Sequence, residues 1–556
     1  MSASTPKKNS FFGGAGILTA GIIIVKLIGA LYKIPLGNIL SDAAFSDFNT
    51  AYNIYSLLII ISTGGLPVAL SKMVSEANAL NRGNQVKKVF SLSLAAFCIL
   101  GTISFCVMAF FPNQLADAMN DSQAAYSILA LAPAVFFICP MSAMRGYFQG
   151  HALMTPTAVS QIIEALCKLV VGLALASTFQ KMLNDEAMAA AGAILGVSVG
   201  CLLGAVYMYF CYRKHARAQP KSNDEPENSG AILATLAKLA VPITLSSSVI
   251  ALTNILDTKI LLGQLQDALG MTEELARETK GVYDKAMTLY NLPVSFMVPL
   301  TASVIPHVSA ALKVKRRRQG AQISETALRT TALLAIPAGV GLFVLGEPIM
   351  RLLYASTDVE LGGWMLSVLG AASIAVCFML VCNSILQAYQ MVTLPMVTTV
   401  IGSGLKLGVA YVLIGNPEIG IRGGAISTVV CFWLIALLDL FIVKRTLPRS
   451  LSLARVFVKP VAAAAAMGAS AWGINGLVTK ALLALKIFVT ETGELLPDGT
   501  AAMGLSRMGN ALAVFGAIGI AVIIYFVLIL VTRAISKEDL ALIPKGDKIA
   551  RILRVE

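Results

Sequence analysis

The chain has 556 residues, of which 57% are hydrophobic and only 13% are charged, and its mean hydropathy is +0.77. Because about a quarter of the residues in a soluble domain are charged, this composition excludes an ordinary soluble globular protein. A net charge of +13 could indicate nucleic-acid binding. The cations, however, lie in short segments between apolar runs, which is typical of signals that set membrane topology.

Apolar runs of about 20 residues recur along the chain, and each is long enough to cross a hydrocarbon core of about 30 Å as a helix. The runs do not alternate between apolar and polar residues, as the strands of a membrane barrel would. We therefore predict an all-α polytopic membrane protein with fourteen transmembrane helices, at 11–34, 48–71, 89–111, 125–147, 156–178, 188–211, 236–262, 284–312, 327–346, 362–387, 394–414, 422–443, 456–479 and 508–532.

The charges of the predicted loops alternate. With the N-terminus in the cytoplasm, the cytoplasmic segments carry 27 Lys and Arg and the opposite loops carry 7. The positive-inside rule then predicts a multi-pass protein of a bacterial plasma membrane with both termini in the cytoplasm. Lys7 and Lys8 precede an apolar stretch without a clear cleavage site, so we expect an uncleaved first span. The nine cysteines form no CxxC pair, and we expect no metal site.

Two halves of the chain resemble each other at a period near 239 residues. Gln149, Pro156 and Lys168 are followed at this distance by Gln387, Pro395 and Lys406. We predict two six-helix lobes and two further helices, as in transporters built from parallel repeats. The predicted division is an N-terminal lobe at 1–212, a cytoplasmic linker at 213–235, a C-terminal lobe at 236–446, and the last two helices with the tail at 447–556.

Charges inside the predicted spans identify a candidate site. A charge near the bilayer centre is costly and normally faces a bundle interior or an aqueous cavity. The cations outnumber the acids, which favours an anionic substrate. The candidates are Lys26, Lys33, Lys168, Lys259 and Lys406 for binding a diphosphate or similar anion, with Glu164 and Asp257 as acidic groups for coupling.

Two of these assignments leave an alternative open. Lys33 precedes Pro35, and its side chain can equally extend to the membrane interface. Glu164 and Lys168 stand four residues apart and can neutralise each other within one helix. Asp439 is expected to pair locally with Lys444 or Arg445.

Gly and Pro residues interrupt the spans and are candidates for hinges in an alternating-access cycle, although kinks that neighbouring helices tolerate explain them equally well. The hinge candidates are Gly64, Gly65, Pro67, Pro299 and Pro306. The sequence carries three His and no Walker A motif. We therefore expect a transporter without catalytic residues or a cofactor, driven by an ion gradient or the membrane potential.

Several stretches resemble one family. VKLIGALYKIPLGNIL at 25–40, AYNIYSLLIIISTGGLPVALSKMVSEA at 51–77, NILDT at 254–258 and VYDKAMTLYNLP at 282–293 are similar to SpoVB-like polysaccharide biosynthesis proteins and MurJ-type lipid II flippases. These proteins belong to the multidrug/oligosaccharidyl-lipid/polysaccharide (MOP) exporter superfamily. The resemblance implies two lobes around a cationic cavity, two C-terminal helices along a groove for a polyprenyl tail, and movement of an undecaprenyl-diphosphate-linked precursor to the outer leaflet.

Residue by residue, the resemblance is incomplete. Lys26 matches a position that is Arg in MurJ-type proteins, and Asp257 matches the Asp of the seventh span. Lys33 falls one place beyond the second expected Arg, where Tyr32 stands, and the basic position of the second span is apolar here, at Ile59 or Ile60. These departures fit the SpoVB-like branch.

Two other functions compete with that of a flippase. A MATE-like cation-coupled exporter of small molecules shares the architecture, but the surplus of lysines and the last two helices argue against it. A membrane glycosyltransferase would need a larger outer domain than the predicted loop at 480–507. The expected partners are a lipid-linked oligosaccharide and the bilayer, and we expect a monomer that binds no nucleic acid.

Overall fold

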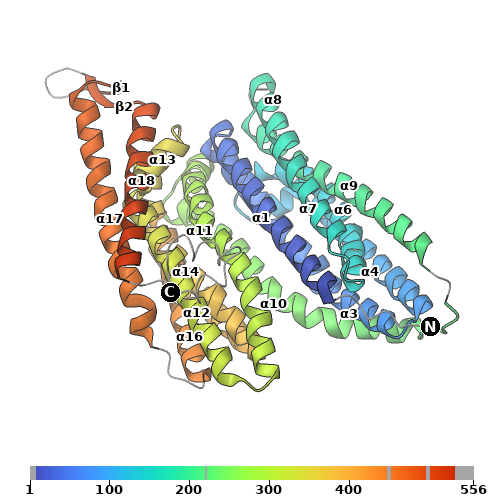
Figure 1. Ribbon diagram of the computed structural model, residues 1–556. Coiled ribbons are helices and arrows are strands. Elements are labelled where there is room, and N and C mark those ends of the chain that lie inside the picture. The colour runs from blue at the N-terminus through green and yellow to red at the C-terminus, as the bar shows by residue number, and fades with distance from the viewer. Residues whose placement is uncertain (1–7, 184, 220–221, 448–451, 496–500, 533–556) are drawn as a thin grey trace. The chain divides into compact units, whose positions relative to one another are not determined.

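The computed structural model describes residues 8–183, 185–219, 222–447, 452–495 and 501–532 (Figure 1). In this part of the chain, thirteen helices are long and apolar enough to cross a membrane. The predicted all-α polytopic fold is confirmed. The predicted eighth span, 284–312, lies within the helix Glu273–Lys313 but is not among the thirteen, so the count of fourteen stays a prediction.

The chain divides into two compact units, at residues 1–281 and 282–556. The lobes predicted from the sequence repeat have other boundaries and stay a prediction. The helices that lie in the first unit or begin in it are α1 (Lys8–Ile39), α2 (Asp42–Thr63), α3 (Leu66–Ala79), α4 (Gly83–Phe110), α5 (Pro112–Asp117), α6 (Ala124–Gly150), α7 (Thr155–Cys167), the π-helical turn η1 (Lys168–Gly172), α8 (Leu173–Leu183), α9 (Glu186–Ala218), α10 (Ser229–Gly263), the π-helical turn η2 (Gln264–Ala268) and α11 (Glu273–Lys313).

The second unit contains the later part of α11 and seven further helices. These are α12 (Arg317–Val344), α13 (Gly346–Leu353), α14 (Val359–Ala388), α15 (Thr393–Ile414), α16 (Arg422–Thr446), α17 (Leu453–Ala484) and α18 (Arg507–Val531). A hairpin of β1 (Val489–Leu495) and β2 (Ala501–Leu505) joins α17 to α18, where the sequence predicts only a loop. Threonine and valine in Val-Thr-Glu-Thr favour an extended strand.

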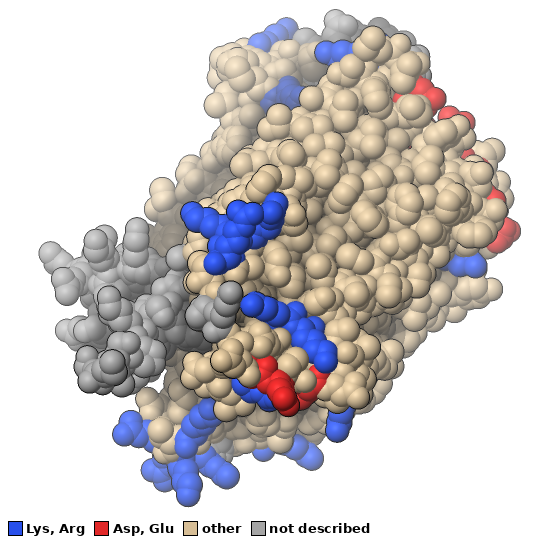
Figure 2. Space-filling model, turned by 90° about the vertical axis from the view of Figure 1, so that its right-hand side faces the viewer, with Lys and Arg blue, Asp and Glu red and all other residues tan. Residues whose placement is uncertain are grey.

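The face shown in Figure 2 has a broad area without Lys, Arg, Asp or Glu, and the charged side chains gather toward its ends. Large hydrophobic side chains are correspondingly exposed along the helices, for example Phe110, Phe210 and Val412. Apolar side chains that face outward over the length of a helix are stable in a hydrocarbon solvent, not in water. This surface agrees with the multi-pass membrane topology.

Glycines on α9 bring the helices of the first unit close together. A Cβ at Gly196 would lie 2.4 Å from the backbone nitrogen of Gly172 in η1, and a Cβ at Gly200 would lie 2.7 Å from the carbonyl oxygen of Glu164 in α7. One turn earlier, Gly192 meets Phe179 and the carbonyl of Leu175 in α8. This glycine ladder, Gly192, Gly196 and Gly200, lets α9 pack directly on the backbone of α7, η1 and α8 (Figure 1).

A buried charge cluster joins the beginning of α11 to α2. The Arg277 guanidinium donates two hydrogen bonds to Asp47, from Nε at 2.7 Å and from Nη2 at 2.6 Å, and its Nε lies 3.5 Å from Asp121. Arg277 is 7% exposed, and both aspartates are fully buried. The topology predicted from the sequence places Arg277 in an outer loop. The helix α11 begins well before the predicted span, at Glu273, which brings Arg277 into the helix bundle.

The connection between α9 and α10 is held on the start of α4. The Asp224 carboxylate accepts hydrogen bonds from the backbone N–H groups of Asn84 and Gln85, at 2.8 and 2.9 Å. These groups have no partner inside α4 because they belong to its first turn. Desolvation acts to raise the pKa of Asp224, but the hydrogen bonds from Ser222, Asn84 and Gln85 outweigh it and lower the pKa to about 2. The polar linker predicted from the sequence therefore caps a helix.

Candidate functional site: a cationic cavity in the first unit

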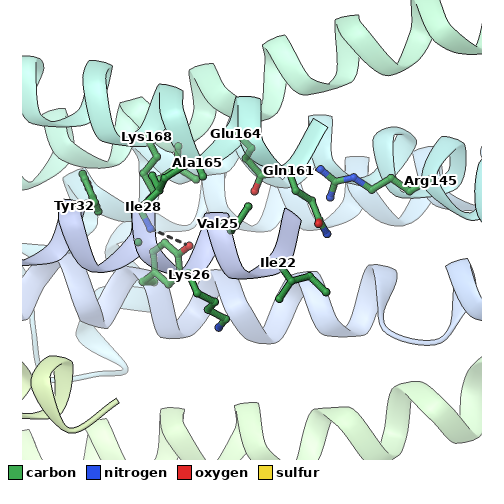
Figure 3. A pocket seen from close by; sticks show the side chains of 13 residues that line it. Ile22, Val25, Lys26, Ile28, Tyr32, Arg145, Gln161, Glu164, Ala165 and Lys168 are labelled. Atoms are coloured by element: carbon green, nitrogen blue, oxygen red, sulfur yellow. Dashed lines mark hydrogen bonds and ion pairs between the residues drawn. The ribbon is translucent and has the colours of Figure 1, made fainter. Parts of the chain in front are cut away.

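A cavity of about 310 Å³ opens between α1, α6 and α7 (Figure 3). Three cations and one carboxylate reach it from these helices and from η1, and tyrosines of α1 and α2 complete its wall. The lining residues are Ile22, Val25, Lys26, Ile28, Gly29, Tyr32, Tyr52, Arg145, Gln161, Glu164, Ala165, Lys168 and Val197.

Lys168 lies among aromatic rings. Its ammonium is 4.5 Å from the ring centroid of Tyr52 and 4.9 Å from that of Tyr32, and it donates a hydrogen bond to the Tyr52 hydroxyl at 3.3 Å. Tyr32 is fixed in turn because its hydroxyl donates to the carbonyl of Ala193 at 3.0 Å. The negative faces of the rings stabilise the ammonium without neutralising it. Because no carboxylate of the described residues pairs with it, this ammonium can accept an anion.

The cavity contains Arg145, which the predicted topology assigns to a cytoplasmic loop. Because α6 continues to Gly150, Arg145 lies inside the helix. Its Nη2 lies 3.2 Å from Oε2 of Glu164, and its Nε donates to Ser160 Oγ at 2.9 Å. The alternative of an ion pair within α7 is not observed, since no ion pair joins Glu164 to Lys168 among the described residues. Nothing in the spacing of Arg145 and Glu164 indicates their contact.

Lys26 and Lys33 lie on α1 and differ in their surroundings. Lys26 lines the cavity and its side chain is exposed. Lys33 is half-buried, donates a hydrogen bond to Asn49 Oδ1 at 3.2 Å, and does not line the cavity. Of the five predicted lysines, the structure thus brings Lys26 and Lys168 together, with Glu164 beside them.

The remaining candidates lie elsewhere in the two units. Asp257 is half-buried and Lys259 is exposed on α10, where Thr258 between them accepts a hydrogen bond from Asn53 of α2 at 3.0 Å. Neither lines the cavity. Lys406 is buried on α15 in the second unit. Asp439 is not paired with Lys444 or Arg445, contrary to expectation, because it points into the contact between α16 and α15 and is bound by Thr398 there.

The hinge candidates Gly64, Gly65 and Pro67 coincide with a break in the helical chain. The helix α2 ends at Thr63 and α3 begins at Leu66. A Cβ at Gly65 would lie 2.1 Å from the carbonyl oxygen of Ala240, so α10 crosses directly over the break. Positions 299 and 306 fall within α11, and the side chains of Pro299 and Pro306 lie outside what the structure describes. Hinge motion stays a prediction at all five positions.

The second unit contains an apolar cavity of about 380 Å³ between α12, α17 and α18. Its polar atoms are few, and the Tyr525 hydroxyl at its edge is satisfied because it donates to the carbonyl of Leu333 at 2.7 Å. The helices α17 and α18 are the last two predicted spans. Residues from both contribute to the wall, among them Met467, Ala471, Ile518, Val522 and Phe526.

Comparisons with known proteins agree with this fold. The family model described as polysaccharide biosynthesis protein matches residues 11–312, and the MatE model matches residues 274–412. Stage V sporulation protein B of Bacillus subtilis is 26% identical over 540 residues, which cover 97% of this chain and 98% of that protein. Lipid II flippase MurJ of the same organism is 26% identical over 417 residues, 71% of this chain and 75% of the flippase.

A solved structure described as lipid II flippase MurJ in an inward closed conformation has a TM-score of 0.66 with this chain. It covers 93% of this chain and 98% of its own, and at 15% identity it shows a shared fold. The resemblance seen in the sequence is thus confirmed. The chain belongs to the polysaccharide biosynthesis protein family, within the MOP exporter superfamily.

Proposed function

We propose that this chain is a flippase that moves an undecaprenyl-diphosphate-linked precursor of cell wall or polysaccharide from the inner to the outer leaflet by alternating access. The observation that carries the proposal is the charge of the cavity. Lys26, Arg145 and Lys168 face one carboxylate, Glu164, so the cavity holds more cations than anions. A diphosphate that enters this cavity gains charge-assisted hydrogen bonds in a site partly shielded from water.

The three cations suit different parts of such a group. Arg145 presents a planar fork of N–H donors, the geometry that binds phosphate oxygens in pairs. Lys168 is a point charge that the rings of Tyr32 and Tyr52 hold in place. Lys26 on α1 lines the cavity with an exposed side chain and could meet the anion from the solvent side. An incoming phosphate would compete with Glu164 for Arg145, because both present oxygens to the same donors.

The apolar cavity of the second unit fits the other end of such a substrate. It is lined almost wholly by hydrocarbon and lies on α17 and α18, the helices to which the family resemblance assigns a groove for the polyprenyl tail. A polyprenyl chain would exchange membrane hydrocarbon for protein hydrocarbon there at little cost. Each cavity by itself suits one end of an amphiphile, the first an anionic head and the second an apolar tail.

The proposal includes a location and an energy source. We place the protein in the bacterial cytoplasmic membrane with both termini in the cytoplasm, as the loop charges predict. An ion gradient or the membrane potential would drive the cycle, because the sequence has no motif for ATP. We expect the working form to be a monomer.

The test is rescue of cells whose own lipid II flippase has been shut off. Surface labelling would follow the lipid-linked precursor in the outer leaflet. We expect the intact chain to restore it, and Lys26→Ala and Asp257→Ala to fail, while Lys181→Ala, which changes an exposed lysine of α8, behaves as the intact chain. A well-inserted chain that restores no precursor would exclude lipid II as its cargo in that host.

A MATE-like exporter of small organic cations is the second candidate, and two observations favour it. The MatE model matches residues 274–412, and the cavity contains a carboxylate, Glu164. Accumulation of a fluorescent organic cation in the same cells distinguishes the two functions. Efflux that depends on Glu164 and leaves the precursor in the inner leaflet would favour the exporter. A glycosyltransferase is disfavoured, because the outer loop contains a two-stranded hairpin in its described part.

A further inference from the structure

A carboxylic acid lies buried in the second unit without a cation beside it. Asp439 of α16 has no exposed surface. Its Oδ1 is 2.7 Å from Thr398 Oγ1 on α15, and its Oδ2 has no hydrogen-bond partner among the described residues. No Lys, Arg or His of the described chain lies within ion-pair distance of it. A charged carboxylate in this position would be stabilised by a single hydrogen bond, far from water.

The hydrogen bonds of Thr398 indicate where the proton lies. The hydroxyl of Thr398 has one proton and two acceptors within reach, the carbonyl of Pro395 at 3.0 Å and Asp439 at 2.7 Å. If Asp439 is ionised, only one of these contacts can be a hydrogen bond, and the other brings two unprotonated oxygens together. If Asp439 carries a proton, it donates to Thr398 Oγ1, and Thr398 donates to Pro395. Only the protonated acid satisfies both contacts.

In the first unit Ser160 corresponds to Thr398, and its second hydrogen-bond partner, Arg145, can only donate. Ser160 lies eight residues before Lys168, as Thr398 lies eight residues before Lys406. Ser160 Oγ donates to the carbonyl three residues earlier, on Thr157, at 2.8 Å, and it accepts from Arg145 Nε at 2.9 Å. In the first unit the hydroxyl therefore gives its own proton to the carbonyl of the preceding turn. If Thr398 does the same in the second unit, its other partner, Asp439, must be the donor.

The groups around Asp439 do not supply a competing charge. The helices that pack against α16 most extensively are α14 and α15, and α11 contacts it through Tyr283, whose hydroxyl lies 3.2 Å from Thr428 Oγ1, and through Tyr290, whose ring stacks with Phe432. On α14 the nearest titratable group is the buried thiol of Cys382. On α15 the cation is Lys406, two helical turns beyond Thr398. On α16 itself, Lys444 and Arg445 follow more than a turn later and do not pair with Asp439.

We infer that Asp439 is a proton-binding site, protonated at neutral pH while α15 and α16 are in contact. The proton comes from water and leaves as the carboxyl becomes a carboxylate, so no other reactant is needed. Because the charged form requires hydration, separation of α15 and α16 favours release and their contact favours uptake. As a coupling device for transport the site rests on the proposed function, whereas its protonation can be measured in the protein at rest.

The experiment is infrared spectroscopy of the purified full-length protein in lipid nanodiscs. The C=O stretch of protonated carboxylic acids is recorded at pH 7 for the intact chain and for Asp439→Asn. The amide that this substitution introduces can donate to Thr398 as the acid does, so the variant is expected to fold. We expect loss of one protonated-acid band in Asp439→Asn. Asp358→Asn, which changes an exposed aspartate at the start of α14, should leave that band unchanged, because Asp358 lies outside the buried contact between α15 and α16.

A second variant checks the hydrogen bond itself. Thr398→Val removes the acceptor, and the Asp439 band is then expected to shift to higher frequency, because the acid loses the partner to which it donates. The inference is overturned if Asp439→Asn removes an ionised carboxylate band at pH 7, with or without Na⁺ present, or if Thr398→Val leaves the acid band where it was. These outcomes do not depend on transport, so a negative result in the precursor assay would affect the proposed flippase alone.

Discussion

Arg145 of α6 lies 3.2 Å from Glu164 of α7, and Lys168, one turn farther along, is bound by Tyr52. These two of the three cations of the cavity therefore differ in kind. Arg145 is neutralised by a carboxylate that a substrate anion could replace. Lys168 contacts aromatic rings and a hydroxyl, and no carboxylate of the described residues lies within ion-pair distance of it. The cavity combines a cation that is paired with a carboxylate and a cation that is held among aromatic rings.

Substitutions of Arg145 and Glu164 are expected to have non-additive effects on the free energy of unfolding. Arg145→Met leaves Glu164 partly buried without its cation, and we expect a loss of about 2 kcal/mol, below the roughly 3–5 kcal/mol of a fully buried pair, because the two side chains are 12% and 25% exposed. Glu164→Met in the same chain should restore part of the loss. Thermal unfolding of the two single variants and the double variant measures the coupling. Strictly additive losses would contradict it.

Lys168→Met is expected to lower outer-leaflet precursor at least tenfold, because the methionine fills the space between the rings but carries no charge. Tyr52→Phe keeps the ring and removes the hydroxyl, so its effect should be smaller, about 0.5–1.5 kcal/mol, or a few-fold. Surface labelling of the precursor measures both. Lys181→Met on α8 is the matched control, since that lysine is exposed. Equal activity of Lys168→Met and Lys181→Met would remove Lys168 from the site.

Arg277→Met is expected to cost about 3–5 kcal/mol, because it leaves Asp47 and Asp121 buried together without a cation. Arg351→Met removes an ion pair that is about half exposed, with Glu347 on α13, and should cost less than about 1 kcal/mol. Thermal unfolding of the two variants in the same detergent makes the comparison. Arg277→Lys should recover little, because a lysine cannot make both bonds to Asp47. Similar losses at Arg277 and Arg351 would argue against the buried cluster.

The cap that Asp224 provides for α4 should depend on pH. The pKa of Asp224 in the folded chain is lowered to about 2, against about 3.9 for an ordinary aspartate. Its contribution to stability is therefore complete above about pH 4 and is lost as the pH falls through about 2. Hydrogen exchange at the amides of Asn84 and Gln85 measures it, after correction for the intrinsic rate. Asp224→Ala should abolish their protection at every pH, and protection that survives this change would assign the cap to another group.

The helices could be predicted from the sequence because their cause is local. Apolar runs of sufficient length specify a spanning helix whatever lies around them, and thirteen of the predicted spans correspond to helices of this kind. The break between α2 and α3 was likewise indicated by Gly64, Gly65 and Pro67 in succession. The hairpin between α17 and α18 was missed, because a short amphipathic stretch predicts a strand weakly.

The site was predicted in part, for an equally physical reason. Lys26, Lys168 and Glu164 could be predicted as site residues, because a charge inside an apolar run is costly in any arrangement of the helices. Arg145 and Arg277 could not be predicted, because each lies near a predicted helix end. At such a position the sequence does not distinguish a cation that points into water from one that points into the bundle. Their partners, Glu164 and Asp47, lie 19 and 230 residues away. Contacts of this kind are set by packing between helices, which one sequence does not encode in any local pattern.

The glycine ladder of α9 also limits which substitutions this protein can accept. At Gly196 and Gly200 even a methyl group would meet backbone atoms, which cannot turn aside as a side chain can. Saturation mutagenesis should therefore find these two positions intolerant of every substitution, whereas Gly404 of α15, where an added methyl group would have no atom within 4 Å, should accept alanine. The wall of the cavity that carries Glu164 and Lys168 is thus constrained by backbone packing, and new substrate preferences would arise more readily on α1, where Lys26 lines the cavity with an exposed side chain.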